Sequence, residues 1–194
     1  MIRESIVTTR NPDGTAHVAP LGVSVEPPWL VIAPFRPSTT LANLERHPFA
    51  CINYTTDVRI FAGCVTGRRR DWPTVPATRV PCPRLEAALA HAEVEVAEVL
   101  QDPQRPRFRC RELLEATHAP FRGLVRAQAA VVEAAILASR LHLLPADKID
   151  REMAYLEIAI QKTAGDAERE AWGWLVEMLA AAGAASDGAP GHEG

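Results

Sequence analysis

The chain changes character near residue 125, and this change constrains its fold more than any other feature of the sequence. Before that point, short apolar runs rich in threonine and valine alternate with turn residues. After it, the sequence is rich in alanine, and apolar residues recur at helical spacing. Runs of strands followed by runs of helices are typical of α+β proteins. We therefore expect a β-rich domain over residues 1–125, a three-helix subdomain over residues 126–183 and a disordered tail over residues 184–194.

The first half predicts an antiparallel barrel with one early helix. Two extended segments flank the turn Asn11-Pro12-Asp13-Gly14 and are expected to form a hairpin, because Gly14 can adopt a positive φ. A helix is expected from Ser38 to His47, before Pro48. Short strands separated by turns are typical of antiparallel barrels. The expected strands are residues 5–9, 15–25, 30–33, 49–54 and 94–99.

The second half predicts three amphipathic helices, each with one apolar face. The first is expected to bury Val132, Ile136, Ser139 and Leu143. The second is expected to begin at Pro145 and to bury Ile149, Met153, Leu156 and Ile160. The third is expected to bury Trp172, Leu175, Val176 and Leu179. Such faces pack on a barrel, on each other or on a second subunit.

Residues 36–44, with the sequence RPSTTLANL, are the strongest candidate for a binding site. They follow the apolar run of residues 30–33, which is typical of a short buried strand. Ser38 is a good N-cap because its hydroxyl can accept a hydrogen bond from the first helical turn. Free backbone N–H groups, hydroxyls and the guanidinium of Arg36 together suit a phosphate. An ordinary capped helix start explains the same residues, so this pattern alone leaves both interpretations open.

Composition excludes several classes of function. The net charge of −3 gives no general attraction to nucleic acid or to an anionic membrane. No apolar run is long enough to span a bilayer, and the N-terminus has no signal-peptide layout, so we expect a cytoplasmic protein. The four cysteines and six histidines show no metal-ligand spacing, so no metal site is expected. Cys51 lies within an expected strand and is interpreted as a buried, inert thiol.

Several ordered motifs resemble the DUF447 family, whose amino-terminal domain is a flavin-reductase-like FMN-binding split barrel. The resemblance covers residues 2–178, and the order and spacing of the motifs carry it. The barrel motifs are IVTT (6–9), DG (13–14), APLGV (19–23), STTLANL (38–44), NYTTD (53–57) and PRLEA (83–87). The helical motifs are RAQAAVVEAAILASRL (126–141), KTAG (162–165) and EAW (170–172).

The resemblance implies a set of FMN-binding residues. It assigns Ser38, Thr39 and Thr40 to the FMN phosphate, with Arg36 as a charge partner. It places Pro20, Leu21 and Gly22 beside the flavin, and Asn53 at the ring or the ribityl chain. The family usually has methionine in place of Leu21 and asparagine in place of His17 and Val125. It also implies a homodimer with the flavin near the subunit interface.

The expected function is an FMN-binding flavoprotein that transfers hydride or electrons to a small-molecule redox partner. Because a flavin supplies the redox chemistry, the missing acid–base and nucleophile motifs are consistent with this function. A link to tetrahydromethanopterin-dependent one-carbon metabolism follows from the resemblance. Two alternatives remain open: a split barrel that binds F420 or haem, with His17 as a conceivable haem ligand, and a non-catalytic scaffold with the helices as its interaction surface.

Overall fold

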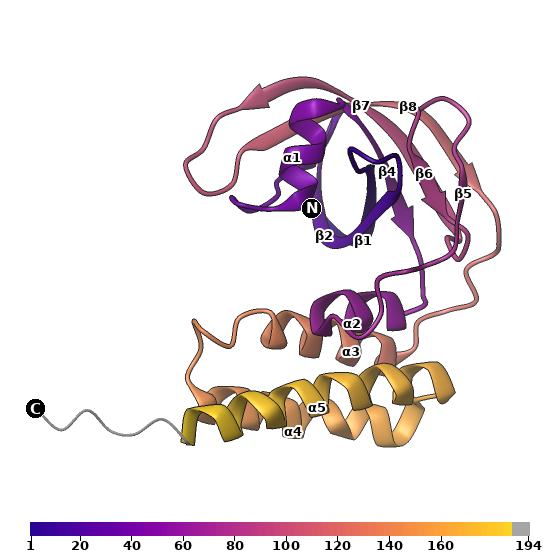
Figure 1. Cartoon of the computed structure of the whole chain (residues 1–194). Coiled ribbons are helices and arrows are strands. Elements are labelled where there is room, and N and C mark those ends of the chain that lie inside the picture. Colours follow the sequence, from indigo (N-terminus) through magenta and orange to yellow (C-terminus); the bar gives the residue numbers. More distant parts are fainter. Residues whose placement is uncertain (188–194) are drawn as a thin grey trace, which may run out of the picture. The chain divides into compact units, whose positions relative to one another are not determined.

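Six antiparallel strands close into a barrel in the computed structural model, which describes residues 1–187 (Figure 1). Around the barrel the strand order is β1-β2-β3-β8-β7-β4, and β4 pairs again with β1. The fold class expected from the sequence, a split β-barrel followed by helices, is confirmed. The barrel strands are β1 (Ile2–Arg10), β2 (Ala16–Glu26), β3 (Trp29–Ile32), β4 (Phe49–Tyr54), β7 (Ala90–Leu100) and β8 (Arg107–Thr117).

The barrel interior is an apolar core to which α1 (Thr39–Arg46) contributes. Alternate strand residues point inward, so Val7, Val23 and Ile52 are fully buried there. Leu41 and Leu44 of α1 pack into the same cluster. The helix therefore covers the barrel core with one face, and its amino-terminal end is held beside the barrel.

A small two-stranded sheet covers part of the outer surface of the barrel. It consists of β5 (Thr74–Pro76) and β6 (Pro83–Leu85), and β6 lies against β1 and β4. We call the connection between them, residues 77–82, the strap. Because of this cover, the outward-facing residues Ile6, Thr8 and Cys51 are as buried as the interior of the barrel.

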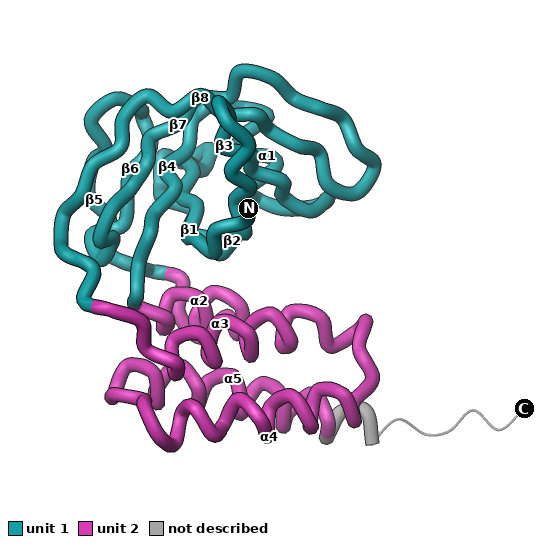
Figure 2. Tube along the Cα trace, turned by 180° about the vertical axis from the view of Figure 1, so that it is seen from behind, with its two compact units in different colours: residues 1–56, 71–122 teal, residues 57–70, 123–194 magenta. Residues whose placement is uncertain are grey.

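Four helices form a second unit (Figure 2). They are α2 (Arg59–Thr66), α3 (Arg126–Ala138), α4 (Ala146–Thr163) and α5 (Asp166–Asp187). This division differs from the one expected at residue 125, because residues 57–70 belong with the later helices. Val58 and Ala62 at the start of α2 pack in one apolar cluster with α3 and α5, which is the physical reason for the difference.

The helix faces were predicted correctly for α4 but not for α3. Ile149 and Ile160 of α4 are buried as expected. In α3 the buried face consists mainly of alanines, whereas Leu143, expected on that face, lies beyond the helix and is 68% exposed. Small residues allow helices to approach closely, so the alanine face forms the contact. Its members are Ala127, Ala130, Val131, Ala134, Ala135, Leu137 and Ala138.

The carboxy-terminal helix is longer than the sequence indicated. α5 continues to Asp187, whereas a disordered tail was expected from residue 184. Residues 188–194, the rest of that expected tail, lie outside the described residues. Among residues 1–187, no helix is long and apolar enough to cross a bilayer.

Candidate functional site

The start of α1 has the capped geometry that the sequence predicts. Ser38 adopts an extended conformation, with φ −157° and ψ 154°, directly before the first helical residue. Its Oγ accepts a hydrogen bond from the backbone N–H of Leu41 at 3.2 Å. This bond satisfies one of the donors that a helix start leaves unpaired. The hydroxyl hydrogen of Ser38 is still available to an acceptor.

Several further hydrogen-bond donors at this helix start are unused. Within residues 1–187, the hydroxyls and backbone N–H groups of Thr39 and Thr40 have no hydrogen-bond partner. Thr39 is exposed, whereas Thr40 is only 3% exposed. A helix N-terminus with unpaired N–H groups and hydroxyls favours an anion electrostatically as well as by hydrogen bonding.

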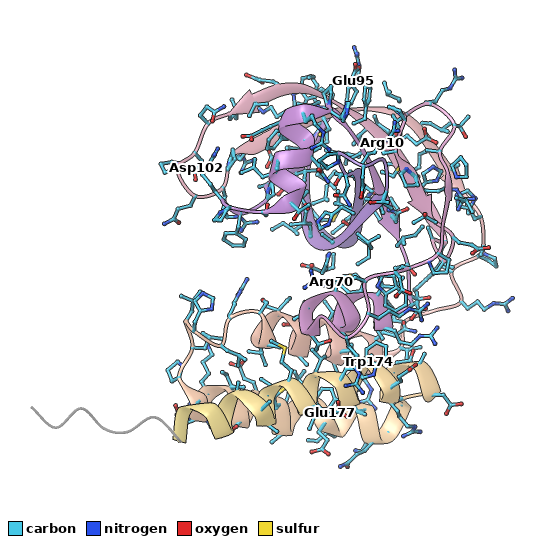
Figure 3. All side chains as sticks on the ribbon, viewed as in Figure 1. Arg10, Arg70, Glu95, Asp102, Trp174 and Glu177 are labelled. Atoms are coloured by element: carbon cyan, nitrogen blue, oxygen red, sulfur yellow. The ribbon has the colours of Figure 1, made fainter. Side chains whose placement is uncertain are left out.

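The loop between β7 and β8, residues 101–106, holds the segment that precedes α1. The backbone N–H of Arg36 donates to the carbonyl oxygen of Gln104 at 2.8 Å. The guanidinium of Arg105 donates to the carbonyl oxygen of Ala33 at 2.8 Å and lies 4.2 Å from the ring centroid of Phe35. Asp102 is on this loop (Figure 3) and accepts from the Arg105 backbone. The sequence reasoning did not identify this loop as part of the candidate site.

Arg36 is positioned to contribute charge to the helix start. Its side chain is 43% exposed, and among residues 1–187 it makes only a long ion pair, 3.7 Å, with Glu45. Exposed pairs of this kind contribute little to stability, so the guanidinium can exchange partners at low cost. The fixed cation and the helix start therefore lie two residues apart on a segment that is anchored through its backbone.

The predicted residues of β2 occupy both faces of the strand. Leu21 packs against the barrel core, whereas Pro20 and Gly22 alternate with it. All three are half-buried. In the register of the sheet, Pro20 lies opposite Ile6 on β1. A Cβ added at Gly22 would come within 2.9 Å of the side chain of Ile2, so the absence of a side chain allows this approach.

Asn53, predicted to contact the cofactor, makes hydrogen bonds to three strands of the barrel unit. It is fully buried on the outer face of the barrel. Its Nδ2 donates to the carbonyl oxygens of Ile6 at 2.9 Å and Cys51 at 3.2 Å. Its Oδ1 accepts from the backbone N–H of Leu85 on β6 at 2.8 Å. The side chain thus joins β4, β1 and β6.

A buried polar chain lies beside Asn53 and was not foreseen from the sequence. The Glu93 carboxylate accepts from three consecutive backbone N–H groups of the strap, those of residues 78–80. It also lies 3.1 Å from Nε2 of His91, and Nδ1 of His91 lies 2.9 Å from Nε2 of His118. Both Glu93 and His91 are almost completely buried. The only sequence signal was a histidine and a carboxylate two residues apart in a strand.

The electrostatics of this chain follow from its hydrogen bonds. Burial acts to raise the pKa of Glu93, but the bonds from the strap backbone and from His91 outweigh it, and the net pKa is lowered. Burial, together with the charge of Arg84 and of His91, lowers the pKa of His118. Glu93 is therefore an anion at neutral pH, and it holds the strap against the barrel.

Two hollows in the first unit could admit a small molecule. One, of about 410 Å³, includes Tyr54, Thr55 and Thr56 at the end of β4, together with Phe121. The other, of about 680 Å³, lies between the β1–β2 turn and the strap. Both volumes fall within the usual range for ligand pockets. Within the described part of the chain, no group of three potential metal ligands is present.

Family models match both halves of the chain. The model described as "Protein of unknown function (DUF447) N-terminal domain" matches residues 3–119, and the DUF447 carboxy-terminal model matches residues 125–177. The chain belongs to the DUF447 family. A search of curated proteins gives no match.

Solved structures share the fold of this DUF447 protein. The FMN-bound protein MM1853 from Methanosarcina mazei, also of this family, is similar with a TM-score of 0.78 and 21% identity, over 91% of this chain and 94% of its own. Flavoredoxin from Methanosarcina acetivorans has a TM-score of 0.52 and 20% identity, over 60% and 69% of the two chains. An NADH:FAD oxidoreductase from Streptomyces globisporus has a TM-score of 0.51 and 12% identity, over 61% and 72%. The last two matches extend over little more than the length of the barrel.

Proposed function

We propose that this DUF447 protein binds FMN and that the start of α1 holds the FMN phosphate. The observation that carries the proposal is the set of unused donors at that helix start. The backbone N–H groups and hydroxyls of Thr39 and Thr40, and the hydroxyl hydrogen of Ser38, can all donate to phosphate oxygens. The similarity over nearly the whole chain to an FMN-bound structure of the same family supports FMN as the phosphate-bearing ligand.

The residues present fit a phosphate in charge as well as in hydrogen bonding. A flavin mononucleotide phosphate carries up to two negative charges near neutral pH, as other phosphate monoesters do. The positive end of the α1 dipole and the guanidinium of Arg36 would offset that charge. Arg105 and the backbone of Gln104 keep the preceding segment in place, so little ordering is required on binding.

A flavin bound here would supply hydride or electron transfer, and this chain would then act as an oxidoreductase. The protein's own part is to bind the phosphate and to exclude water from the flavin. Pro20 and Gly22, half-buried on β2, are the residues that we propose beside the ring. A role in tetrahydromethanopterin-dependent one-carbon metabolism is a further part of this hypothesis, and assays with reduced pterins as electron donors would test it.

Comparing FMN with riboflavin tests the phosphate site directly, because riboflavin lacks the phosphate. We expect Thr39→Ala and Thr40→Val to weaken FMN binding by about tenfold or more each, since each removes a hydrogen bond to a charged group. Riboflavin affinity should change less than twofold. Thr40→Val keeps the shape of this buried side chain, and Ser139→Ala, which removes a hydroxyl at the end of α3, is the matched control.

The visible spectrum of the purified protein separates the alternatives. A flavin spectrum supports the proposal, whereas a Soret band or a deazaflavin spectrum would replace FMN with haem or F420. Equal losses of FMN and riboflavin affinity would place the phosphate elsewhere. A colourless protein that binds none of these molecules would favour the non-catalytic scaffold.

We also propose a homodimer with the flavin near the subunit interface. This proposal is supported by the apolar side chains that the protein exposes, among them Ile2, Phe35 and Phe121, which are 64%, 57% and 58% exposed. Light scattering of the purified protein should give twice the mass of one chain. A monomeric mass with FMN bound would refute the dimer and leave the phosphate site intact.

A further inference from the structure

Two cysteines from distant parts of the sequence meet beneath the strap. Cys51 lies on β4 and Cys82 at the end of the strap, and their Sγ atoms are 3.6 Å apart. Cys51 Sγ also lies 3.6 Å from the carbonyl oxygen of Cys82. Cys51 is fully buried and Cys82 is 3% exposed. The sequence interpretation of Cys51 as a buried, inert thiol did not include this neighbour.

The two thiols differ in access. Cys82 lines the hollow of about 680 Å³ between the β1–β2 turn and the strap, and Cys51 is not among the residues that line it. A small polar oxidant that enters the hollow therefore meets Cys82 first. Cys51 lies directly behind it, within reach of a sulfur that has been oxidised.

The surroundings of the pair favour this division of roles. The hydrogen bond with Cys82, followed by burial and the nearby charge of Glu93, raises the pKa of the Cys51 thiol far above its ordinary value. Cys51 thus keeps its proton at neutral pH. Cys82 is the thiol with access to the hollow, so it is the one that an oxidant reaches first.

We propose that Cys51 and Cys82 form a reversible disulfide, driven by peroxide, that fastens the strap to β4. Cys82 attacks one oxygen of hydrogen peroxide, which gives a sulfenic acid and releases water. The sulfur of Cys51 then displaces the hydroxyl group from that sulfenic acid, and a second water forms with the Cys51 proton. Two thiols and one peroxide give one disulfide and two waters, so the two electrons lost by sulfur reduce the peroxide.

The strap does not depend on these cysteines for its position in the reduced protein. The Glu93 carboxylate accepts hydrogen bonds from three backbone N–H groups of the strap. The hydroxyl of Thr8 donates to the carbonyl oxygen of Pro83, the residue directly after the strap. The disulfide would thus turn a hydrogen-bonded segment into one that is covalently fixed. The hollow beside the strap would be held in one shape while the protein is oxidised.

Mass spectrometry of the native full-length chain after treatment with hydrogen peroxide tests the proposal. The chain has four cysteines, and we expect two thiols to disappear and the mass to fall by about 2 Da. Proteolysis without reduction should join the peptides that contain Cys51 and Cys82. A thiol reductant should restore all four thiols. The test is independent of any bound cofactor.

Single substitutions test the order of events. In Cys51→Ser the sulfenic acid on Cys82 has no partner, so dimedone should label Cys82. In Cys82→Ser, Cys51 should stay unlabelled. Cys64→Ser is the matched control, and it should still form the cross-link and retain one thiol, that of Cys110. Dimedone labelling of Cys51, a cross-link to Cys64 or Cys110, or no loss of thiols before the chain unfolds would overturn the proposal.

Discussion

Glu93→Gln tests whether the buried carboxylate holds the strap. Each carboxylate oxygen now accepts two hydrogen bonds. Oε1 accepts a hydrogen bond from the backbone N–H of Thr78 at 2.7 Å and is hydrogen-bonded to Nε2 of His91. Oε2 accepts hydrogen bonds from the backbone N–H of Arg79 and from that of Val80, the latter at 3.0 Å. Glutamine places an NH₂ group at one of these positions. The NH₂ group is less costly at the position of Oε1. There His91 can change tautomer and accept from it, whereas a backbone N–H cannot become an acceptor.

The expected loss in the free energy of unfolding follows from these four hydrogen bonds. One partly buried backbone N–H, that of Thr78, would face a donor, which costs about 1–3 kcal/mol. The two bonds that remain lose the assistance of the negative charge, about 0.5–1 kcal/mol each. We therefore expect Glu93→Gln to lower the free energy of unfolding by about 2–5 kcal/mol. Glu95→Gln is the matched control on the same strand, and loss of its surface pair with Arg111 should cost less than about 1 kcal/mol.

Urea denaturation at several pH values provides the assay. Because the pKa of Glu93 is lowered in the folded state, its stabilising contribution is complete above the pKa of the unfolded chain and is lost as the pH falls through the folded pKa. The stability gap between wild type and Glu93→Gln should thus be largest above about pH 5 and should shrink on acidification. Equal effects of the two substitutions, or a gap that widens in acid, would refute the reasoning.

Three further substitutions test other parts of the structure by the same denaturation assay. Asn53→Ala should cost about 2–4 kcal/mol because it leaves a buried strand N–H unpaired, and a neutral effect would contradict its structural role. Leu175→Ala should cost about 2–5 kcal/mol because Leu175 is fully buried in the helical cluster, whereas Val176 is 42% exposed and Val176→Ala should cost less than about 1 kcal/mol. Similar costs for the two substitutions would contradict this placement of the apolar cluster. Gly22→Ala should cost about 1 kcal/mol or less because exposed Ile2 can move, and Ile2→Ala should remove that cost.

The sequence predicted the turns and helix starts whose conformation depends on residues close together in the chain. The turn after β1 does contain a Gly14 with φ 88°, and α1 begins after Ser38 as expected. β8 was missed although Arg107, Phe108 and Arg109 begin a regular alternation that indicates a strand. α2 gave a weaker signal, since its N-cap residue is Val58, which has no side-chain group that can cap the helix. Its helical state depends on packing against segments more than sixty residues later in the chain.

The candidate site was predictable only where it is contiguous in sequence. The donors from Ser38 to Thr40 form one motif, and no acceptor in the described part of the chain uses them. The support from Arg105 comes from a loop that is distant in sequence and carries no motif. Glu93 was missed for a related reason. A carboxylate in a strand indicates a solvent-exposed face, and only the strap, which covers it from elsewhere, makes it buried.

The position of α2 has a consequence for how the two units can be separated. The chain leaves the barrel after β4, forms α2 within the helical unit and then returns for the remaining strands. A cut at residue 122 would therefore not release a self-sufficient barrel. The fragment would retain Val58 and Ala62 on a helix whose apolar partners had been deleted. Because the helical unit takes α2 from within the barrel's stretch of sequence, no single truncation of the gene separates the two units cleanly.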